Sequence, residues 1–558
     1  MFFKKYGLYF LLFLLILFIY WTPMGSGDAI CTDDDWLLNS VRKFKSLNDY
    51  FSSYFQYGTL DRQPVRDLSI YIDDAISSWI GFPIFRITNV AIWVISLFIF
   101  QRILALFAWP SIWIQGILLY IGTHPVAVNS VGMFASRKHL LSVFFTLCIF
   151  YFILKFSRTS QQLSWRQATL ILFCYLLGCL SQPLQVLTPL GFIFFIDNKK
   201  EFILRNKKII FGFILIAGAI LLDNYLYYAS EVYAKTVGYS KFAVQHGVLK
   251  RFFIYGRSFF QVVFPGYPSI LPYELGKIKD WIGWIFLFIF ALILLMLRLK
   301  KGKMVERFFW PKISGAILLF FLPLLVVTIR VTIQGGWDTY LLFSLFAWAI
   351  FLKEIYAATV QESLAQSGIW TRRAVAGIAA GAISFNTTIS YQHAQYFISP
   401  EKVFQRMSIL EHSNLYRMMY AHVRINNHPD QVDEIYQDAL QVYESDPRTA
   451  NLGYVLGRSL VYTGLLSSSD KFSLWEKLEV PSFWWHYWKA VFYVKQAQPE
   501  RANEIMTRAW EIFKEAPLDD VDKFEEIVSN WIKMCDLAKK SECEIEIRNK
   551  VRSRLETR

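Results

Sequence analysis

The chain is 558 residues long, and its composition excludes an ordinary soluble protein. Hydrophobic residues make up 54% of it and aromatic residues 18%, whereas soluble domains are roughly 45–50% apolar. The formal net charge of +14 fits basic cytoplasmic loops between membrane helices better than a nucleic-acid-binding surface. We therefore expect an integral membrane protein with a water-soluble part and no nucleic-acid partner.

Apolar runs that could cross a bilayer recur through residues 1–390. A membrane helix needs about 20 apolar residues, and about 17 suffice. By this criterion we expect about eleven transmembrane helices, from the run at 9–20 to the run near 374–390. The first run follows two lysines and is interpreted as an uncleaved anchor, with a cleaved signal peptide as the alternative.

Lysine and arginine residues assign the two sides of the membrane, because short basic loops stay in the cytoplasm. If the helices alternate in direction, the basic loops at 4–5, 155–166, 198–208, 298–307 and 372–373 all fall on one side. The N terminus is then cytoplasmic, and the loops at 25–83, 123–139 and 223–280 lie outside with everything after residue 390. The charge-poor outer loops favour a bacterial inner membrane and a periplasmic C-terminal domain, with the endoplasmic reticulum as the alternative.

Residues 391–558 are predicted to form a second, extracytoplasmic domain. Segments such as 431–444 and 500–515 place apolar residues at helical spacing, with proline breaks between them. The order of aromatic and small residues in 450–464 and 483–517 is similar to that of tetratricopeptide repeats (TPR). We expect a short TPR-like α-solenoid of two or three hairpins, because each repeat needs neighbours to bury its apolar face.

Three consecutive aspartates, Asp33, Asp34 and Asp35, follow the first membrane helix on the predicted outer side. Clustered carboxylates raise one another's pKa unless cations offset their charge, so the run is either a solvated turn or a functional site. Its hard oxygen ligands could also hold a divalent cation. Further along the same loop, residues 62–93 fit either a plain interfacial helix or one that presents a lipid-linked substrate.

Arg137 and Lys138 lie at the predicted outer end of a membrane helix, where basic residues are uncommon. They either extend their long side chains to the membrane surface or bind an anion, for which an arginine fork and a lysine charge are suited. Arg257, in the outer loop at 223–280, either extends to the aromatic membrane interface or binds a lipid phosphate.

Taken together, these segments resemble the C-type membrane glycosyltransferases (GT-C), and in particular the protein O-mannosyltransferase-like proteins with tetratricopeptide repeats. The family's acidic pair resembles Asp33 to Asp35, and its Pro-Leu-x-x-Leu-Ser segment resembles residues 64–69. Its His-x-x-Asn-x-x-x-His segment resembles residues 86–93. Its His-Pro and Arg-Lys-Asp segments resemble residues 124–129 and 137–139, and its Ser-Lys-Pro segment resembles residues 181–189. Asp338 and Tyr340 look like the ends of a later Asp-Arg-Tyr motif.

The resemblance implies a membrane glycosyltransferase that moves a mannose-like hexose from a polyprenyl-phosphate donor to a protein hydroxyl on the outer face, with inversion. Asp34, or else Asp33 or Asp35, would be the general base. The candidate ligands of the donor phosphate are Arg137, Lys138, Arg86 and Arg257. The candidate substrate-binding residues are His124, Asn129, Asn89, Asp338 and Tyr340. No cofactor is certain, and the TPR-like domain would recruit the acceptor protein.

The chain departs from the family pattern at several of these positions. Arg86 and Trp93 replace histidines, Asn129 replaces a glutamate, His139 an aspartate and Gln182 a lysine. Either the donor differs from the family's, or the site has decayed and the protein is a membrane scaffold that recruits proteins through its TPR-like domain. A transporter is less well supported, because polar residues gather at helix ends rather than near the membrane midplane. Whether Cys535 and Cys543 form a disulfide stays open.

Overall fold

The computed structural model describes residues 2–25, 32–55, 62–159, 162–229, 259–263, 303–330, 341–359, 369–411, 414–447, 452–462 and 483–513, with a few short stretches between them. Every element assigned in this part of the chain is a helix, which confirms the all-α class predicted from the sequence. The chain divides into two compact units, unit 1 at Met1–Ser399 and unit 2 at Pro400–Arg558. The sequence placed the boundary between the two domains at 390/391.

Unit 1 is built from long apolar helices and several short ones. In chain order they are α1 (Phe2–Gly25), α2 (Thr32–Arg42), α3 (Leu47–Phe55), α4 (Pro64–Ile80), α5 (Phe85–Leu106), α6 (Ser111–Gly122), α7 (Val126–Gly132), α8 (Arg137–Thr159), α9 (Trp165–Ser181), η1 (Pro183–Leu187), α10 (Thr188–Phe192), η2 (Ile193–Phe195), α11 (Lys199–Arg205), α12 (Lys207–Ala229), α17 (Lys303–Arg330), α19 (Leu342–Thr359), α21 (Ile369–Ala394) and η5 (Gln395–Ile398).

Four of these helices, within α1, α5, α8 and α12, are long and apolar enough to cross a membrane. The pair α6 and α7 passes the same test as one span that is bent by 62°. Phe211, Ile214 and Leu215 on α12 are between 62% and 66% exposed, as expected of a helix that faces lipid. The chain is therefore compatible with a membrane protein, and the count of eleven crossings stays a prediction.

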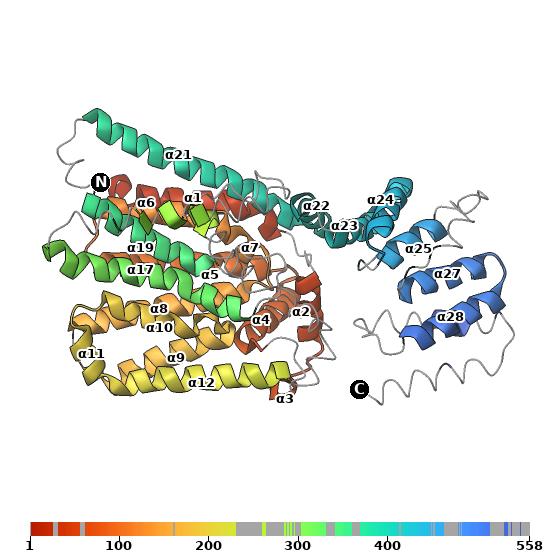
Figure 1. Ribbon diagram of the computed structural model, residues 1–558, viewed down its shortest axis with the longest axis horizontal. Helices are drawn as coiled ribbons and strands as arrows, with labels where there is room; N and C mark the ends of the chain where they lie inside the picture. Colours follow the sequence, from red (N-terminus) through yellow and green to blue (C-terminus); the bar gives the residue numbers. More distant parts are fainter. Residues whose placement is uncertain are drawn as a thin grey trace. The chain divides into compact units, whose positions relative to one another are not determined.

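The long helices of unit 1 lie side by side, with α2, α3 and α4 at one end and α11 at the other (Figure 1). Helix α8 packs against α5 and α9, α17 against α19, and α1 against α21. The loop expected at 25–83 thus contains α2, α3 and α4, and the loop expected at 123–139 contains α7 and the first residues of α8. We call the end with α2, α3 and α4 the acidic end, after Asp34, Asp67 and Asp73.

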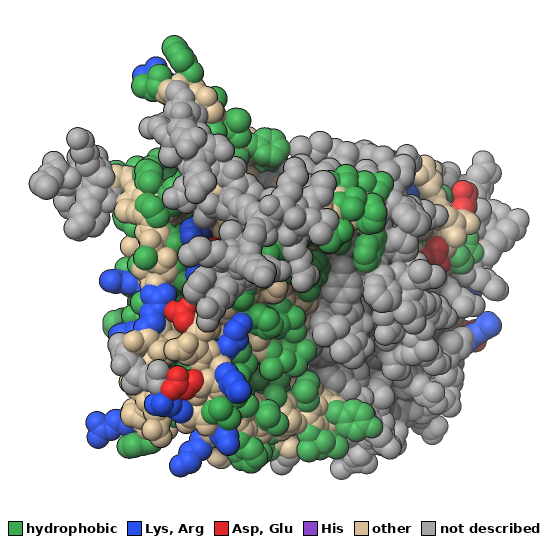
Figure 2. Space-filling view, turned by 60° about the vertical axis from the view of Figure 1, so that its left-hand side comes forward, with side chains coloured by type: hydrophobic (Ala, Val, Ile, Leu, Met, Phe, Trp, Pro, Cys, Tyr) green, Lys and Arg blue, Asp and Glu red, His purple; other side chains and the backbone are tan. Residues whose placement is uncertain are grey.

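Exposed basic side chains lie at the opposite end, which we call the basic end. Arg158, Arg166, Arg205, Lys207 and Lys208 are all exposed there. The backbone N–H of Leu163, between α8 and α9, donates to Asn206 Oδ1 at 2.9 Å, so two of the basic loops lie against each other. Figure 2 shows Lys and Arg side chains gathered over part of this face. The predicted orientation requires this charge distribution, and the orientation itself stays a prediction.

The turn between α4 and α5 brings the polar residues of these helices together. Pro64 begins α4, where a missing N–H costs nothing. Gly81 ends the helix with φ +70°, a conformation that glycine adopts without strain. Its N–H bonds to the carbonyl of Ser77, and Ser77 Oγ accepts from the N–H of Ile84 at 3.1 Å. Helix α5 therefore runs back against α4.

Unit 2 contains α22 (Pro400–Glu411), α23 (Asn414–Asn427), η6 (Pro429–Gln431), α24 (Val432–Ser445), α25 (Leu452–Tyr462), α27 (Phe483–Lys495) and α28 (Pro499–Phe513). Consecutive helices pack against each other, and α23 also packs against α25. Their apolar faces form one core that includes Ile435, Val455, Trp485 and Met506. A series of packed helical hairpins agrees with the predicted helical domain, whereas its TPR-like character stays a prediction.

Candidate functional site

Asp34 is a buried carboxylate in the first turns of α2. Its side chain is 0% exposed, and its Oδ1 accepts a hydrogen bond from the backbone N–H of Ala135 at 2.7 Å. Leu37, Leu38 and Val41 of the same helix pack with Ile70, Phe85 and Phe134, so an apolar cluster holds α2 in place. The N-terminal end of a helix favours a negative charge. Asp33 and Asp35 lie in the same turn, and their side chains are outside the described residues.

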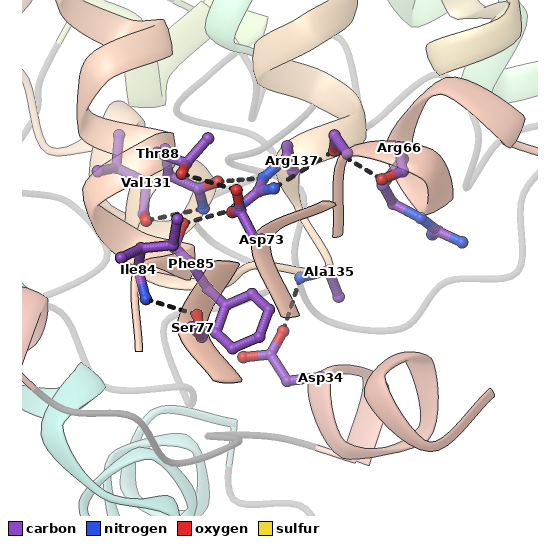
Figure 3. A network of polar contacts seen from close by, with 12 residues as sticks. Asp34, Arg66, Asp73, Ser77, Ile84, Phe85, Thr88, Val131, Ala135 and Arg137 are labelled. Carbon is purple, nitrogen blue, oxygen red and sulfur yellow. Dashed lines mark hydrogen bonds and ion pairs between the residues drawn. The ribbon is translucent and has the colours of Figure 1, made fainter. Parts of the chain in front are cut away.

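Arg137 is the central cation of the acidic end and is 0% exposed. Its Nη2 lies 2.6 Å from Asp73 Oδ2 and donates to the carbonyl of Phe85 at 2.6 Å. Its Nε donates to Asn89 Oδ1 at 2.7 Å, and its Nη1 donates to Ser69 Oγ at 3.3 Å. Figure 3 shows this guanidinium between α4 and α5. One side chain at the start of α8 thus binds both neighbouring helices.

Asp73 is the acidic partner that the sequence analysis did not single out. It is buried, and Thr88 Oγ1 donates to its Oδ1 at 3.0 Å. Burial raises the pKa of Asp73, while the positive charge and hydrogen bonds of Arg137 act in the opposite direction. Arg66, Ile70 and Asp73 are spaced four and three residues apart and share one buried face of α4. That spacing was the signal in the sequence that could have revealed Asp73.

Asn89 and Arg86, two of the predicted site residues, bind the end of α7. Asn89 Nδ2 donates to the carbonyls of Val131 and Met133, both at 3.1 Å. Arg86 Nε donates to the carbonyl of Gly132 at 2.9 Å, and Nη1 reaches the carbonyl of Pro23 at 3.4 Å. The last carbonyls of a helix have no partner within it. These α5 side chains supply partners, and they fix the segment that precedes Arg137.

His124 lies in the break between α6 and α7 and is fully buried. Its Nδ1 accepts from the N–H of Val126 at 3.3 Å, and its Nε2 lies 3.1 Å from the carbonyl of Val262. This pair of contacts assigns the ring proton to Nε2. Asn129 and Lys138 are half-buried near the same segment. Arg257, Asp338 and Tyr340 lie outside the described residues.

Two further polar contacts organise the acidic end. Arg66 pairs with Asp67 at 2.7 Å, and Tyr50 donates to Asp67 Oδ2 at 3.1 Å. Burial, followed by the charge of Asp67, raises the pKa of Tyr50. Arg62 Nε donates to Asp223 Oδ2 at 3.0 Å, which ties the segment before α4 to the end of α12. The acidic end is thus connected across α3, α4 and α12.

The Asp triplet is the place where the sequence suggested a divalent cation. Among the residues that the structure describes, no three His, Cys, Asp or Glu side chains form a group that could hold a metal ion. The side chains of Asp33 and Asp35 are not among those residues. The divalent cation stays a prediction.

The fold and the site together define an all-helical protein with several helices that could span a membrane and a buried acid–base network at one end of unit 1. Comparison with models of known protein families found no match, and comparisons with curated proteins and with solved structures found none.

Proposed function

We propose that the protein is a C-type membrane glycosyltransferase that moves a mannose-like hexose from a polyprenyl-phosphate donor to a protein hydroxyl on the outer face of the membrane. The observation that supports this most is Asp34, a fully buried carboxylate at the start of α2 whose Oδ1 accepts from the N–H of Ala135, two residues before the buried Arg137. The proposal includes about eleven crossings, an N terminus in the cytoplasm of a bacterium, and a TPR-like unit 2 in the periplasm.

Asp34 would act as the general base in this reaction. As the acceptor oxygen forms its bond to the anomeric carbon, its proton would pass to the Asp34 carboxylate. The bond between the anomeric carbon and the phosphate oxygen would break, and the phosphate would leave with the electron pair. Attack from the face opposite the phosphate inverts the configuration. Lys138 and Arg257 are the proposed cations for the leaving phosphate, and Arg86 would join them only by exchanging its contacts with the Gly132 and Pro23 carbonyls.

Arg137 fits a positioning role in this proposal better than direct phosphate binding. Its guanidinium already bonds to Asp73, Asn89 and the Phe85 carbonyl. A phosphate would have to replace one of these buried contacts, and an unpaired buried charge is costly. Arg137 would instead keep α4, α5 and α8 together and place a positive charge near the base.

The same contacts support a second candidate, a membrane scaffold without transferase activity. If the guanidinium groups of Arg137 and Arg86 serve only to hold the protein together, the family positions that they occupy have become structural. Unit 2 would then recruit partner proteins to the membrane with no sugar transfer.

Mass spectrometry of exported glycoproteins separates the two candidates. We would compare cells with the intact protein, cells without it, and cells with Asp34→Asn. The asparagine Oδ1 can still accept from the Ala135 N–H, so the variant keeps the fold but loses the base. Loss of a general base slows a reaction by about a hundredfold to ten-thousandfold. We therefore expect hexose-modified peptides to disappear in the deleted cells and in those with Asp34→Asn.

Asp74→Asn is the matched control, because Asp74 lies in the same outer loop and pairs with Arg42 at the surface, at 2.8 Å. It should leave the glycopeptides unchanged. If Asp34→Asn also leaves them unchanged while the variant protein is present in the membrane, Asp34 is not the base. If, in addition, cells whose protein lacks residues 400–558 behave like cells without the whole protein, the scaffold candidate is supported.

A further inference from the structure

Aromatic rings cross three helices of unit 2 that pack in the order α23, α25 and α27. The His422 ring on α23 stacks on Tyr454 of α25 at 4.2 Å between centroids. Tyr454 in turn makes edge contacts with Trp484 and Trp488 of α27, at 5.6 Å and 5.8 Å. All four side chains are half-buried, so each presents part of its surface to solvent. With Arg458 they form what we call the aromatic strip.

Close packing between α25 and α27 fixes the aromatic strip. A Cβ atom added to Gly457 would lie 2.6 Å from Trp488 Cβ, so only glycine allows this approach. Arg458 Nη1 donates to the Tyr454 hydroxyl, and the guanidinium lies over the Tyr454 and Trp488 rings at 5.6 Å and 5.9 Å. These contacts hold the strip in one arrangement, which lowers the entropic cost of binding a ligand.

Acidic residues are absent from the three described helices that carry the strip. The helices α23, α25 and α27 contain no aspartate or glutamate, and their basic and histidine residues are Arg417, His422, Arg424, Arg458, His486, Lys489 and Lys495. The other α-helices described in unit 2, α22, α24 and α28, contain acidic residues, and α22 and α28 also contain basic ones. On α23, Arg424 pairs with Glu434 of α24 at 2.9 Å, and Arg417 pairs with Asp438. On α25 and α27 the charged side chains, Arg458, Lys489 and Lys495, are all basic.

The basic groups beside the rings of the strip are Arg458 and, one residue after Trp488, Lys489. A negatively charged ligand would be attracted to this surface, and aromatic rings beside the cations would pack against apolar or aromatic side chains of the same ligand.

We infer that the aromatic strip is a docking surface for an acidic, aromatic-containing segment of a partner protein. Carboxylates of the segment would lie near Arg458 and Lys489, and its ring would pack on Tyr454, Trp484 and Trp488. Neighbouring helix axes are about 8–10 Å apart, so an extended segment of about six residues would cross all three helices. The inference specifies the partner of unit 2 and does not require that unit 1 transfers a sugar.

A membrane surface is a poorer partner for the strip. Insertion into a bilayer interface requires exposed large apolar side chains. Within the described part of unit 2, the exposed large apolar side chains are Ile409 and Leu537, and neither lies on α23, α25 or α27. The strip rings instead contact one another and stay half-buried.

The test is fluorescence anisotropy of a labelled peptide, Glu-Tyr-Glu-Glu-Tyr-Glu, with the full-length protein in uncharged detergent. We expect saturable binding that weakens with salt. At low salt, replacing the Glu residues of the peptide by Gln, or its Tyr residues by Gly, should also weaken binding. Arg458→Gln with Lys489→Gln should weaken binding about tenfold, since two partly exposed charge contacts are lost. Lys489→Glu alone leaves the Arg458 contacts intact and should also weaken binding.

The matched control removes two positive charges elsewhere in unit 2. Lys402 and Lys533 are exposed and lie off the strip, so Lys402→Gln with Lys533→Gln should leave the affinity within about twofold of the original. Equal losses in both double variants would overturn the inference, as would no binding. Stronger competition by oligothymidylate or by phosphatidylserine-doped micelles than by the unlabelled peptide would also overturn it. None of these outcomes depends on glycopeptides, so the transferase proposal is judged separately.

Discussion

Arg137 introduces a positive charge into the interior between α4, α5 and α8. Removal of one member of a buried ion pair leaves the other charge without compensation and costs about 3–5 kcal/mol. We expect Arg137→Met to lower the free energy of unfolding by this amount, because Asp73 at 2.6 Å would lose its cation. Thermal unfolding of the purified protein in detergent would measure the change.

The exposed pair of Arg42 and Asp74 serves as the control for this prediction. The Arg42 side chain is 54% exposed, and surface pairs contribute about 0–1 kcal/mol, so Arg42→Met should have little effect. Arg137→Met combined with Asp73→Leu should recover much of the loss, since no charge is left buried. Equal effects of Arg137→Met and Arg42→Met would contradict the role that we assign to the buried pair.

The run of aspartates and the basic residues at a helix end pointed to Asp34 and Arg137, and the resemblance to the glycosyltransferase family pointed to Asn89. The structure joins Arg137 and Asn89 directly, by a hydrogen bond of 2.7 Å. Asp73 and Thr88 were not predicted to be their neighbours. Those neighbours depend on the turn at Gly81, which folds α5 back against α4, and a turn's three-dimensional course is not encoded in hydrophobic spacing. The partners of a buried charge therefore had to come from the structure.

At the scale of an element, α17 shows how closely the helices of unit 1 approach. A Cβ atom on Gly315 would lie 2.7 Å from Phe194 Cβ in η2. We expect Gly315→Ala to destabilise unit 1 by about 1–3 kcal/mol, because an added methyl group must displace a packed aromatic segment. The unfolding temperature of the full-length protein in detergent would show the loss.

Gly218 on α12 is the matched position for that experiment. A Cβ atom there would meet no atom within 4 Å, and alanine stabilises an exposed helix by about 0.5–1 kcal/mol relative to glycine. Gly218→Ala should therefore be neutral or stabilising. If Gly315→Ala is equally harmless, η2 and α17 are not packed as the structure has them.

The helices themselves were the most predictable feature of the chain, because apolar runs of sufficient length form helices in a membrane. Their interruptions were less predictable. The segment around His124 and Pro125 was assigned to an outer loop, and in the structure it is a short break between α6 and α7, whose axes differ by 62°. Helix α7 is held by side chains of α5, and such long-range contacts leave no periodic signal in the sequence. For the same reason, the sequence does not predict which glycines are tightly packed.

At the scale of the whole molecule, the change in composition near residue 390 anticipated a second domain, and the structure divides the chain at Ser399. A loss of span-length apolar runs is visible in any sequence, because a soluble helix buries only one face. The TPR-like pattern is a finer statement, since it depends on the placement of small residues between neighbouring helices. Gly457 does lie close against Trp488 between α25 and α27, and the TPR-like character itself stays a prediction.

The positions of basic side chains predict which end of unit 1 faces the cytoplasm. Basic side chains gather at one end of unit 1, at Arg158, Arg166 and Lys208, while Lys45 lies between α2 and α3 at the other end. Because short basic loops stay in the cytoplasm, a membrane-impermeant maleimide added to intact cells should label Lys45→Cys and Lys402→Cys but not Lys208→Cys. Permeabilised cells should label all three.

The background for this labelling should be low once Cys31, Cys535 and Cys543 are changed to serine, because Cys148, Cys174 and Cys179 are buried or half-buried within α8 and α9. Labelling of Lys208→Cys in intact cells would reverse the proposed orientation. Labelling of Lys45→Cys without Lys402→Cys would mean that an odd number of crossings separates the first outer loop from unit 2. In that case unit 2, with its aromatic strip, would face cytoplasmic partners, and Asp34 and unit 2 could not act on the same acceptor.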